Sequence, residues 1–312
     1  MILAVCLNAA IDVTYTVDEN VPGSSHRIRS VQQRAGGKGV NVARVLTQLG
    51  EPVTLLAFAG PATGVELRTE LEDAQIPHRL IPTAHDTRRT VTVVDPSGAT
   101  VFNEPGPEIA PAEWAVLVEA FRSLLAGSDL VVLAGSLPPG LPDAGYGELV
   151  EHARAANVRA VVDADGSALA HALVARPFLV KPNHHELGEL LGRSLADLDA
   201  VADAAAELRR RGPEAVLVSR GADGLFAATP DGDYLAVPAE TVSGNPTGAG
   251  DSLVAAVAAG LVRGEQWPDV LRDGVAVSAA AVAVPVAGAF AAEVAQRLRP
   301  HVRVSPVPAP RP

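Results

Sequence analysis

A glycine-rich turn near the carboxyl end of the sequence carries the residues best suited to chemistry. Residues 244–252 read Gly-Asn-Pro-Thr-Gly-Ala-Gly-Asp-Ser, and the alanine-rich run that follows, 253–262, is typical of a helix. Glycine and proline are disfavoured inside helices, so the turn is predicted to end where the helix begins. Unpaired backbone N–H groups and the positive end of the helix dipole would then face one point, which favours binding of an anion such as phosphate.

Asp251 lies in the same turn, where a carboxylate beside an anion needs a chemical role. One such role is that of a general base, which takes a proton from a hydroxyl attacking a phosphoryl group. The plainer interpretation is a helix N-cap, because Asp and Ser are common capping residues and no Lys follows the last glycine as in a Walker A motif. Taken by itself, the turn leaves both interpretations open.

Composition limits the class of protein. The 312 residues are 48% hydrophobic and 4% aromatic, with a formal net charge of -11. A chain of this length can bury a large core, and its acidity argues against nucleic acid or an anionic membrane surface as a partner. The single cysteine, Cys6, excludes an internal disulfide and a Cys/His zinc site. With no basic start typical of a signal peptide and no apolar run of membrane-spanning length, the sequence predicts a soluble, cytoplasmic protein.

The elements that must position the turn alternate regularly along the chain. Apolar runs typical of buried strands alternate with helical runs, and this pattern predicts a parallel sheet with helices on both faces. Polar and glycine residues follow each strand, at the edge where such folds bind ligands. The expected strands are 2–7, 53–59, 78–81, 130–134, 159–163, 178–180 and 215–218, and further helices are expected at 64–74, 111–125, 268–284 and 289–298.

Two segments, 10–33 and 86–104, depart from this alternation. Their amphipathic strands, expected at 14–17, 27–34, 88–94 and 100–103, predict a small second sheet that forms a lid over the site. The α/β domain would then comprise residues 1–9, 34–85 and 105–300. An exposed lid edge with one apolar face suits pairing with another copy, which predicts a homodimer through the lid. The proline-rich tail, 301–312, is predicted to be disordered.

A second glycine turn enters a helix early in the chain, with the residues Gly36-Gly37-Lys38-Gly39-Val40-Asn41-Val42-Ala43. This turn and Thr247-Gly248-Ala249-Gly250-Asp251-Ser252 together resemble the two signatures of the PfkB carbohydrate kinases of the ribokinase-like fold, over nearly the whole chain. Shorter pieces, such as Gly135-Ser136-Leu137-Pro138-Pro139-Gly140, are similar to the branch of 1-phosphofructokinases and tagatose-6-phosphate kinases.

The resemblance implies a three-layer α/β/α fold with a mainly parallel sheet and a small β lid. It implies transfer of a phosphoryl group from ATP, with Mg²⁺, to a primary hydroxyl of a phosphorylated ketohexose. Fructose 1-phosphate, tagatose 6-phosphate and fructose 6-phosphate are the candidate substrates.

Individual residues also receive roles from the resemblance. Asp251 would be the general base, and the N–H groups from Gly248 to Asp251, including those of Ala249 and Gly250, would hold the transferring phosphoryl group. Asn183 and Glu186 would organise Mg²⁺ through water, and the run 278–288 would line the adenine slot. The sugar would be bound by Asp12, Gly36, Gly37, Lys38, Asn41, Arg88, Arg27 and Ser136. The nucleotide would be bound by Lys181, Asn183, Glu186, Ser219, Gly221, Gly224, Gly248 and Gly250.

Several of these residues also have a plainer interpretation. Asp12 is typical of a turn cap, Lys38 of a solvated surface lysine, and Asn183 with Glu186 of a helix capping pair. Arg27 also suits an exposed strand edge, where charges prevent unwanted pairing. Arg88 is expected to grip the phosphate already on the sugar, because a guanidinium fork matches phosphate geometry.

Two other functions fit the same sequence. One is a kinase of a non-phosphorylated sugar or a nucleoside on the same fold, since Ala9 and Thr90 stand where the branch usually has Pro and Asn. The other is a sugar or nucleotide sensor without turnover. The intact Asp251 argues against a sensor, because a binding protein has no use for a base at that position.

Overall fold

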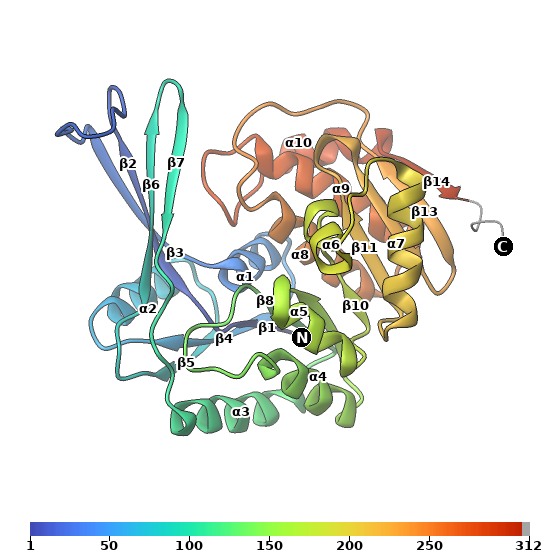
Figure 1. The fold of residues 1–312 in the computed structure, drawn as a ribbon, viewed down its shortest axis with the longest axis horizontal. Coiled ribbons are helices and arrows are strands. Elements are labelled where there is room, and N and C mark those ends of the chain that lie inside the picture. The colour runs from blue at the N-terminus through green and yellow to red at the C-terminus, as the bar shows by residue number, and fades with distance from the viewer. Residues whose placement is uncertain (308–312) are drawn as a thin grey trace.

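One ten-stranded sheet forms the centre of the computed structural model, which describes residues 1–307 (Figure 1). Its strand order is β14-β13-β12-β11-β10-β9-β8-β1-β4-β5. Neighbouring strands are parallel from β5 to β11, and β12, β13 and β14 are added antiparallel. The strands are β1 (Ile2–Cys6), β4 (Val53–Ala59), β5 (His78–Pro82), β8 (Leu130–Ala134), β9 (Arg159–Asp163), β10 (Leu179–Val180), β11 (Ala215–Ser219), β12 (Leu225–Thr229), β13 (Gly232–Val237) and β14 (Arg303–Val307).

Helices cover both faces of this sheet, which confirms the predicted three-layer architecture. Successive strand residues point to opposite faces, so Ala4 joins one apolar cluster and Val5 the other, and both are fully buried. The first cluster includes α1 (Lys38–Gln48), α2 (Thr63–Asp73), α8 (Ala249–Arg263), α9 (Trp267–Val282) and α10 (Ala292–Leu298). The second includes α3 (Pro111–Leu125), α4 (Gly145–Ala155), α5 (Gly166–Val174), α6 (His184–Leu191) and α7 (Leu198–Arg210).

A separate four-stranded sheet, which we call the lid, stands out from this body in Figure 1. Its order is β3-β2-β6-β7, with β2 and β6 parallel and the outer strands antiparallel. Its strands are β2 (Ala10–Thr16), β3 (Ser30–Gly36), β6 (Arg88–Asp95) and β7 (Gly98–Asn103). Val31, Val101 and Phe102 are exposed apolar residues of the lid. A second sheet drawn from the two expected segments is therefore present, while the division of the chain into domains stays a prediction.

Several sequence expectations are corrected by the structure. The tail was expected to be disordered from residue 301, but residues 303–307 form β14 and pair with β13; residues 308–312 lie outside the described part of the chain. The expected lid strands are displaced to 10–16 and 30–36, and α9 and α10 are shorter than expected, at 267–282 and 292–298. Within residues 1–307 no helix combines the length and apolar character needed to cross a membrane.

Candidate active site

The late glycine turn ends at the start of α8, as the sequence predicted. Gly248 is the N-cap residue and has a φ of 83°, a conformation that glycine adopts without strain. The N–H of Ala249 donates back to the carbonyl of Pro246 at 3.1 Å. The N–H groups of Gly250 and Asp251 make no hydrogen bond to the residues that the structure describes. The turn therefore presents unpaired donors at a helix N-terminus, which is the geometry of an anion site.

Asp251 lies in the first turn of α8 and is 6% exposed. Nδ2 of Asn41, on α1, donates to Oδ2 of Asp251 at 2.7 Å in a buried contact. Burial and the nearby Asp163 raise the pKa of Asp251 to about 6, against the hydrogen bond from Asn41 and the charges of Lys38 and Lys181. A carboxylate with this pKa is ionised at neutral pH and can still accept a proton, as a general base must.

Asp163 is the last residue of β9 and is 1% exposed, and its charge acts on Asp251. Nζ of Lys181 lies 3.2 Å from its Oδ1, and Nζ of Lys38 lies 3.7 Å from the same oxygen. Both contacts are ion pairs, and Oδ1 has no well-directed hydrogen bond within the described residues. Asp163 raises the pKa of the Lys38 ammonium. Asp163 thus draws both lysines toward Asp251, and Lys38 is partly buried in an ion pair instead of fully solvated as in the plainer interpretation.

The early glycine turn connects the lid to α1 and brings Asp12 close to the same region. Asp12, on β2, lies opposite Arg34 on β3 and Thr90 on β6. A Cβ on Gly36 would lie 2.0 Å from Oδ2 of Asp12, so only glycine leaves room for this carboxylate. Burial raises the pKa of Asp12, against the charge of Arg88 and a hydrogen bond from Thr90.

Arg88 is held by main-chain carbonyls at the start of β6. Its Nε donates to the carbonyl of Asn8 at 3.2 Å, and its Nη1 donates to the carbonyl of Glu104 at 3.0 Å. Asn8 in turn donates through Nδ2 to Oγ of Ser136 at 3.1 Å. The structure thus brings Arg88 and Ser136 together through Asn8, a residue to which the sequence interpretation gave no role.

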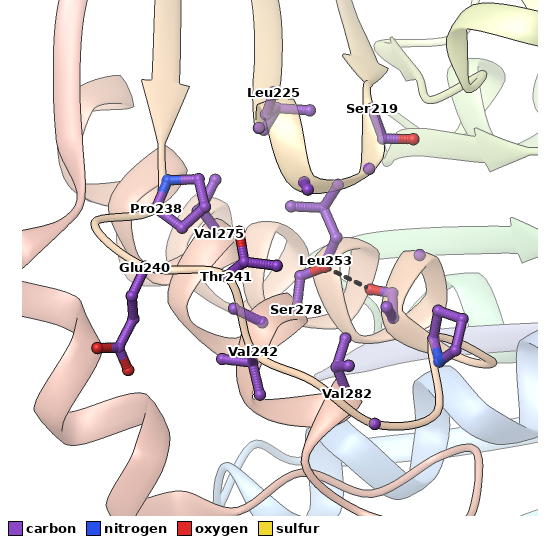
Figure 2. Close-up of a pocket in the computed structure, with 18 of the residues that line it drawn as sticks. Ser219, Leu225, Pro238, Glu240, Thr241, Val242, Leu253, Val275, Ser278 and Val282 are labelled. Carbon is purple, nitrogen blue, oxygen red and sulfur yellow. Dashed lines mark hydrogen bonds between the residues drawn. The ribbon is translucent and has the colours of Figure 1, made fainter.

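A cavity of about 630 Å³ lies beside the late turn, and Figure 2 shows the residues that line it. Ser219, Gly221 and Gly224 line it from β11 and the turn that follows, while Gly250 lines it from α8. Its walls are mostly apolar, and Oγ of Ser278 donates to the carbonyl of Ala249 at 2.9 Å. From the predicted adenine-slot run, Ser278, Ala279 and Val282 line the cavity, together with Leu225, Pro238, Val242, Leu253 and Val275.

Asn183 and Glu186 form a capping box at the start of α6. Oδ1 of Asn183 accepts from the N–H groups of His185 and Glu186 at 2.9 Å each, and Oε2 of Glu186 accepts from the N–H of Asn183 at 2.8 Å. The plainer interpretation of this pair is therefore confirmed. Oε1 of Glu186 makes no hydrogen bond or ion pair within residues 1–307, so the cap leaves one carboxylate oxygen available.

The structure places Arg27 away from the other residues that were expected to bind the sugar. Arg27 is exposed in the connection between β2 and β3, which forms the outer tip of the lid in Figure 1. Two charged residues that sequence reasoning had not placed in the site lie close to Asp12 instead, namely Arg34 and Arg44. For Asp163 the only available indication was its place at the carboxyl end of a buried strand.

A helix N-terminus with unpaired N–H groups beside a deep cavity is an arrangement typical of proteins that bind phosphorylated ligands. The chain belongs to the pfkB family of carbohydrate kinases, and the family model matches residues 1–293. It is 34% identical over 305 residues to a 1-phosphofructokinase of Bacillus subtilis, covering 98% of this chain and 99% of the relative. It is therefore a phosphotransferase that acts on a sugar hydroxyl, and the predicted family resemblance is confirmed.

Solved structures agree with this assignment. The structure of Escherichia coli phosphofructokinase-2 in complex with fructose-6-phosphate matches with a TM-score of 0.89 and 30% identity, covering 96% of this chain and 98% of that chain. Arabidopsis thaliana ribokinase complexed with ribose and ATP matches with a TM-score of 0.76 and 21% identity, covering 96% of this chain and 98% of that chain. This second likeness shows the ribokinase-like fold.

Proposed function

We propose that this kinase transfers the γ-phosphoryl group of ATP to a primary hydroxyl of a phosphorylated ketohexose, with Asp251 as general base. Fructose 1-phosphate, tagatose 6-phosphate and fructose 6-phosphate are the candidate substrates. The observation that carries the proposal is the placement of Asp251, buried, held by Asn41 at 2.7 Å and with a pKa of about 6, next to two unpaired amides.

The chemistry follows from these contacts. Asp251 accepts the proton of the attacking hydroxyl, while the N–H groups of Gly250 and Asp251 and the nearby ammonium of Lys181 stabilise charge on the transferring phosphoryl group. A Cβ on Gly250 would lie 3.6 Å from Nζ of Lys181, so this ammonium adjoins the turn. The transfer is direct, with no covalent enzyme intermediate.

Arg88 supports a substrate that already carries a phosphate. Two of its nitrogens are bound to main-chain carbonyls, which orients the guanidinium beside Asp12, and its Nη2 has no hydrogen-bond partner within residues 1–307. A fixed guanidinium with a free nitrogen suits a phosphate oxygen. The rival proposal, a kinase of a neutral sugar or nucleoside, has no comparable use for this group.

A magnesium ion fits the acidic side of the site. Oε1 of Glu186 has no hydrogen-bond partner within the described residues, whereas Oδ1 of Asp163 is already paired with Lys181 and Lys38. Oxygen atoms of this kind suit Mg²⁺ and its waters. We propose that Glu186 holds the ion through water, where it would neutralise charge on the nucleotide phosphates, and that Asn183, whose Oδ1 is used by the helix cap, positions Glu186.

Turnover against a panel of free and phosphorylated sugars, in a coupled assay with ATP, tests the proposal. Asp251→Asn should lower kcat by about 10²- to 10⁴-fold, and full activity in this variant would reject the mechanism. Arg88→Ala should weaken binding of the sugar phosphate but not of ATP. The matched control is Arg89→Ala, because the neighbouring Arg89 pairs with Glu66 at 3.3 Å instead. Unchanged sugar affinity in Arg88→Ala would favour a neutral substrate.

A homodimer through the lid and a cytoplasmic location complete the proposal. The exposed Val31, Val101 and Phe102 support pairing of lids. Escherichia coli phosphofructokinase-2 has been solved in a tetrameric inhibited form, so assembly occurs in the family. Phe102→Glu should lower the mass measured by light scattering if the lid forms the interface.

A further inference from the structure

Residues 283–291, which we call the bridge loop, join α9 to α10 and are fixed to the body near both ends. Nδ2 of Asn245 donates to the carbonyl of Pro285 at 3.0 Å. At the other end, Nε2 of Gln48 donates to the carbonyl of Phe290 at 2.7 Å, and Oε1 of Gln48 accepts from the N–H of Phe290 at 3.3 Å. The middle of the loop is thus held between Asn245 and the end of α1. Asn245 belongs to the late glycine turn, residues 244–252, which we call the catalytic turn below.

The lid contacts this loop through Arg34. Arg34 is half-buried on β3, directly opposite Asp12 on β2, and its Nη1 donates to the carbonyl of Ala287 at 3.0 Å. A hydrogen bond from a charged donor is stronger than a neutral one and fixes both partners more firmly. The strand that lies beside the sugar ligand Asp12 is therefore tied to the centre of the bridge loop.

The same part of the bridge loop lies against the late glycine turn and against Asn41, the residue that donates to Asp251. A Cβ on Gly248 would lie 2.9 Å from the Cβ of Ala287 and 3.2 Å from the nitrogen of Gly288. A Cβ on Gly288 would lie 2.8 Å from Oδ1 of Asn41. Neither glycine has room for a side chain, so the bridge loop packs with its backbone directly against Gly248 and Asn41, and packed groups transmit displacement. A shift of Ala287 must therefore move Gly248, Asn41 or both.

We propose that Arg34 is a positioning residue that couples the lid to the catalytic turn. Sugar bound at Asp12 fixes β2 and β3, Arg34 transfers that position to Ala287, and the bridge loop then sets Gly248 and the Asn41–Asp251 pair for phosphoryl transfer. This inference rests on the proposed function for the places of sugar and base. Coupling of this kind is reciprocal, so the nucleotide must strengthen sugar binding by the factor with which the sugar strengthens nucleotide binding.

The test is the coupling factor, measured by calorimetry. We would use the panel sugar with the fastest turnover and the non-hydrolysable analogue AMP-PNP, each titrated with and without the other. Wild-type protein should show a factor of about 5 to 150. In Arg34→Met the factor should fall to within about twofold of one, with kcat lowered, while affinity for AMP-PNP alone stays unchanged. Loss of the Arg34 charge near Asp12 changes the sugar affinity equally with and without AMP-PNP. This change therefore cancels in the coupling factor, which is the ratio of the two affinities.

Three further variants sharpen the result. Arg34→Lys keeps a cationic donor and should restore most of the coupling. Gln48→Met loosens the bridge loop from the side of α1 and should lower the coupling without touching the lid. Arg29→Met is the matched control, because Arg29 is a lid arginine whose ion pair, with Asp18, stays within the lid; its coupling should equal that of the wild type.

A wild-type factor of one, or an Arg34→Met factor equal to that of the wild type, would overturn the inference. So would an equal loss of coupling in Arg29→Met, since a general weakening of the lid would then explain the effect. The coupling factor is obtained from binding alone, so it is measured without turnover and separately from the role of Asp251 as base. Full turnover in Asp251→Asn would reject the proposed mechanism and leave the coupling result standing.

Discussion

Replacing Asn41 by leucine is expected to move the acidic limb of the pH–rate profile to higher pH. The amide of Asn41 lowers the pKa of Asp251, against burial and Asp163, which raise it to about 6. A hydrogen bond to a charged group contributes about 1.5–3 kcal/mol, and one pKa unit corresponds to about 1.4 kcal/mol. Loss of the amide should therefore raise the pKa of Asp251 by about one to two units.

The size of the effect depends on the pH of the measurement. With a pKa of about 6, about nine-tenths of the molecules carry an ionised Asp251 at pH 7 and about half at pH 6. With a pKa of about 7, these fractions fall to about half and about one-tenth. Because the base acts only when ionised, protonation alone should lower kcat about twofold at pH 7 and about fivefold at pH 6. Activity is lost as the pH falls through the raised pKa.

A coupled assay from about pH 5 to pH 9 measures the limb directly. Asp163→Asn should have the opposite effect, because the charge of Asp163 raises the pKa of Asp251. The acidic limb of the pH–rate profile of this variant should therefore move to lower pH. An Asn41→Leu enzyme that turns over with its limb at the wild-type position, or below it, would refute the electrostatic reasoning. A limb that moves the same way in both variants would refute it as well.

Three other perturbations follow from the packing. Gly36→Ala places a methyl group on the carboxylate of Asp12, so KM for the sugar should rise while AMP-PNP affinity stays the same; an unchanged KM would count against Asp12 as a sugar ligand. Lys181→Met leaves Asp163 buried with one partner fewer and should lower the free energy of unfolding by about 3–5 kcal/mol in urea titrations; a smaller loss than in Lys38→Met would contradict this. Deletion of residues 303–312 removes β14 and exposes the edge of β13, so the melting temperature should fall and light scattering should rise on heating; an unchanged melting curve would show that β14 adds no stability.

The sheet could be predicted from the sequence where its strands are buried on both faces, because such strands are continuous apolar runs such as residues 130–134. β14 was missed for a physical reason. It contains Pro306, which normally excludes a strand, but β14 is the edge of the sheet, where a missing N–H is tolerated. The expected lid strands were displaced because half-exposed segments give a weaker alternation than buried ones.

Site residues were predictable where chemistry requires glycine next to a polar group, as in the turn before Asp251. Other roles depend on partners far away in the chain. Asp163 matters because Lys181 and Lys38 reach it, and Arg34 matters because it meets Ala287 across 253 positions. No local pattern marks such pairs, so only the folded chain reveals them.

The topology of the lid also sets the order in which this protein can fold. Its two central strands, β2 and β6, are parallel neighbours, yet the chain between them builds β3, α1, β4, α2 and β5. Closing so long a connection costs entropy that is recovered only after those elements have packed. During synthesis β2 and β3 therefore emerge well before β6, and the sugar side of the site is completed after the body has begun to form. The cavity beside the late turn forms later still, because the residues that line it, 219–282, follow β6 in the chain.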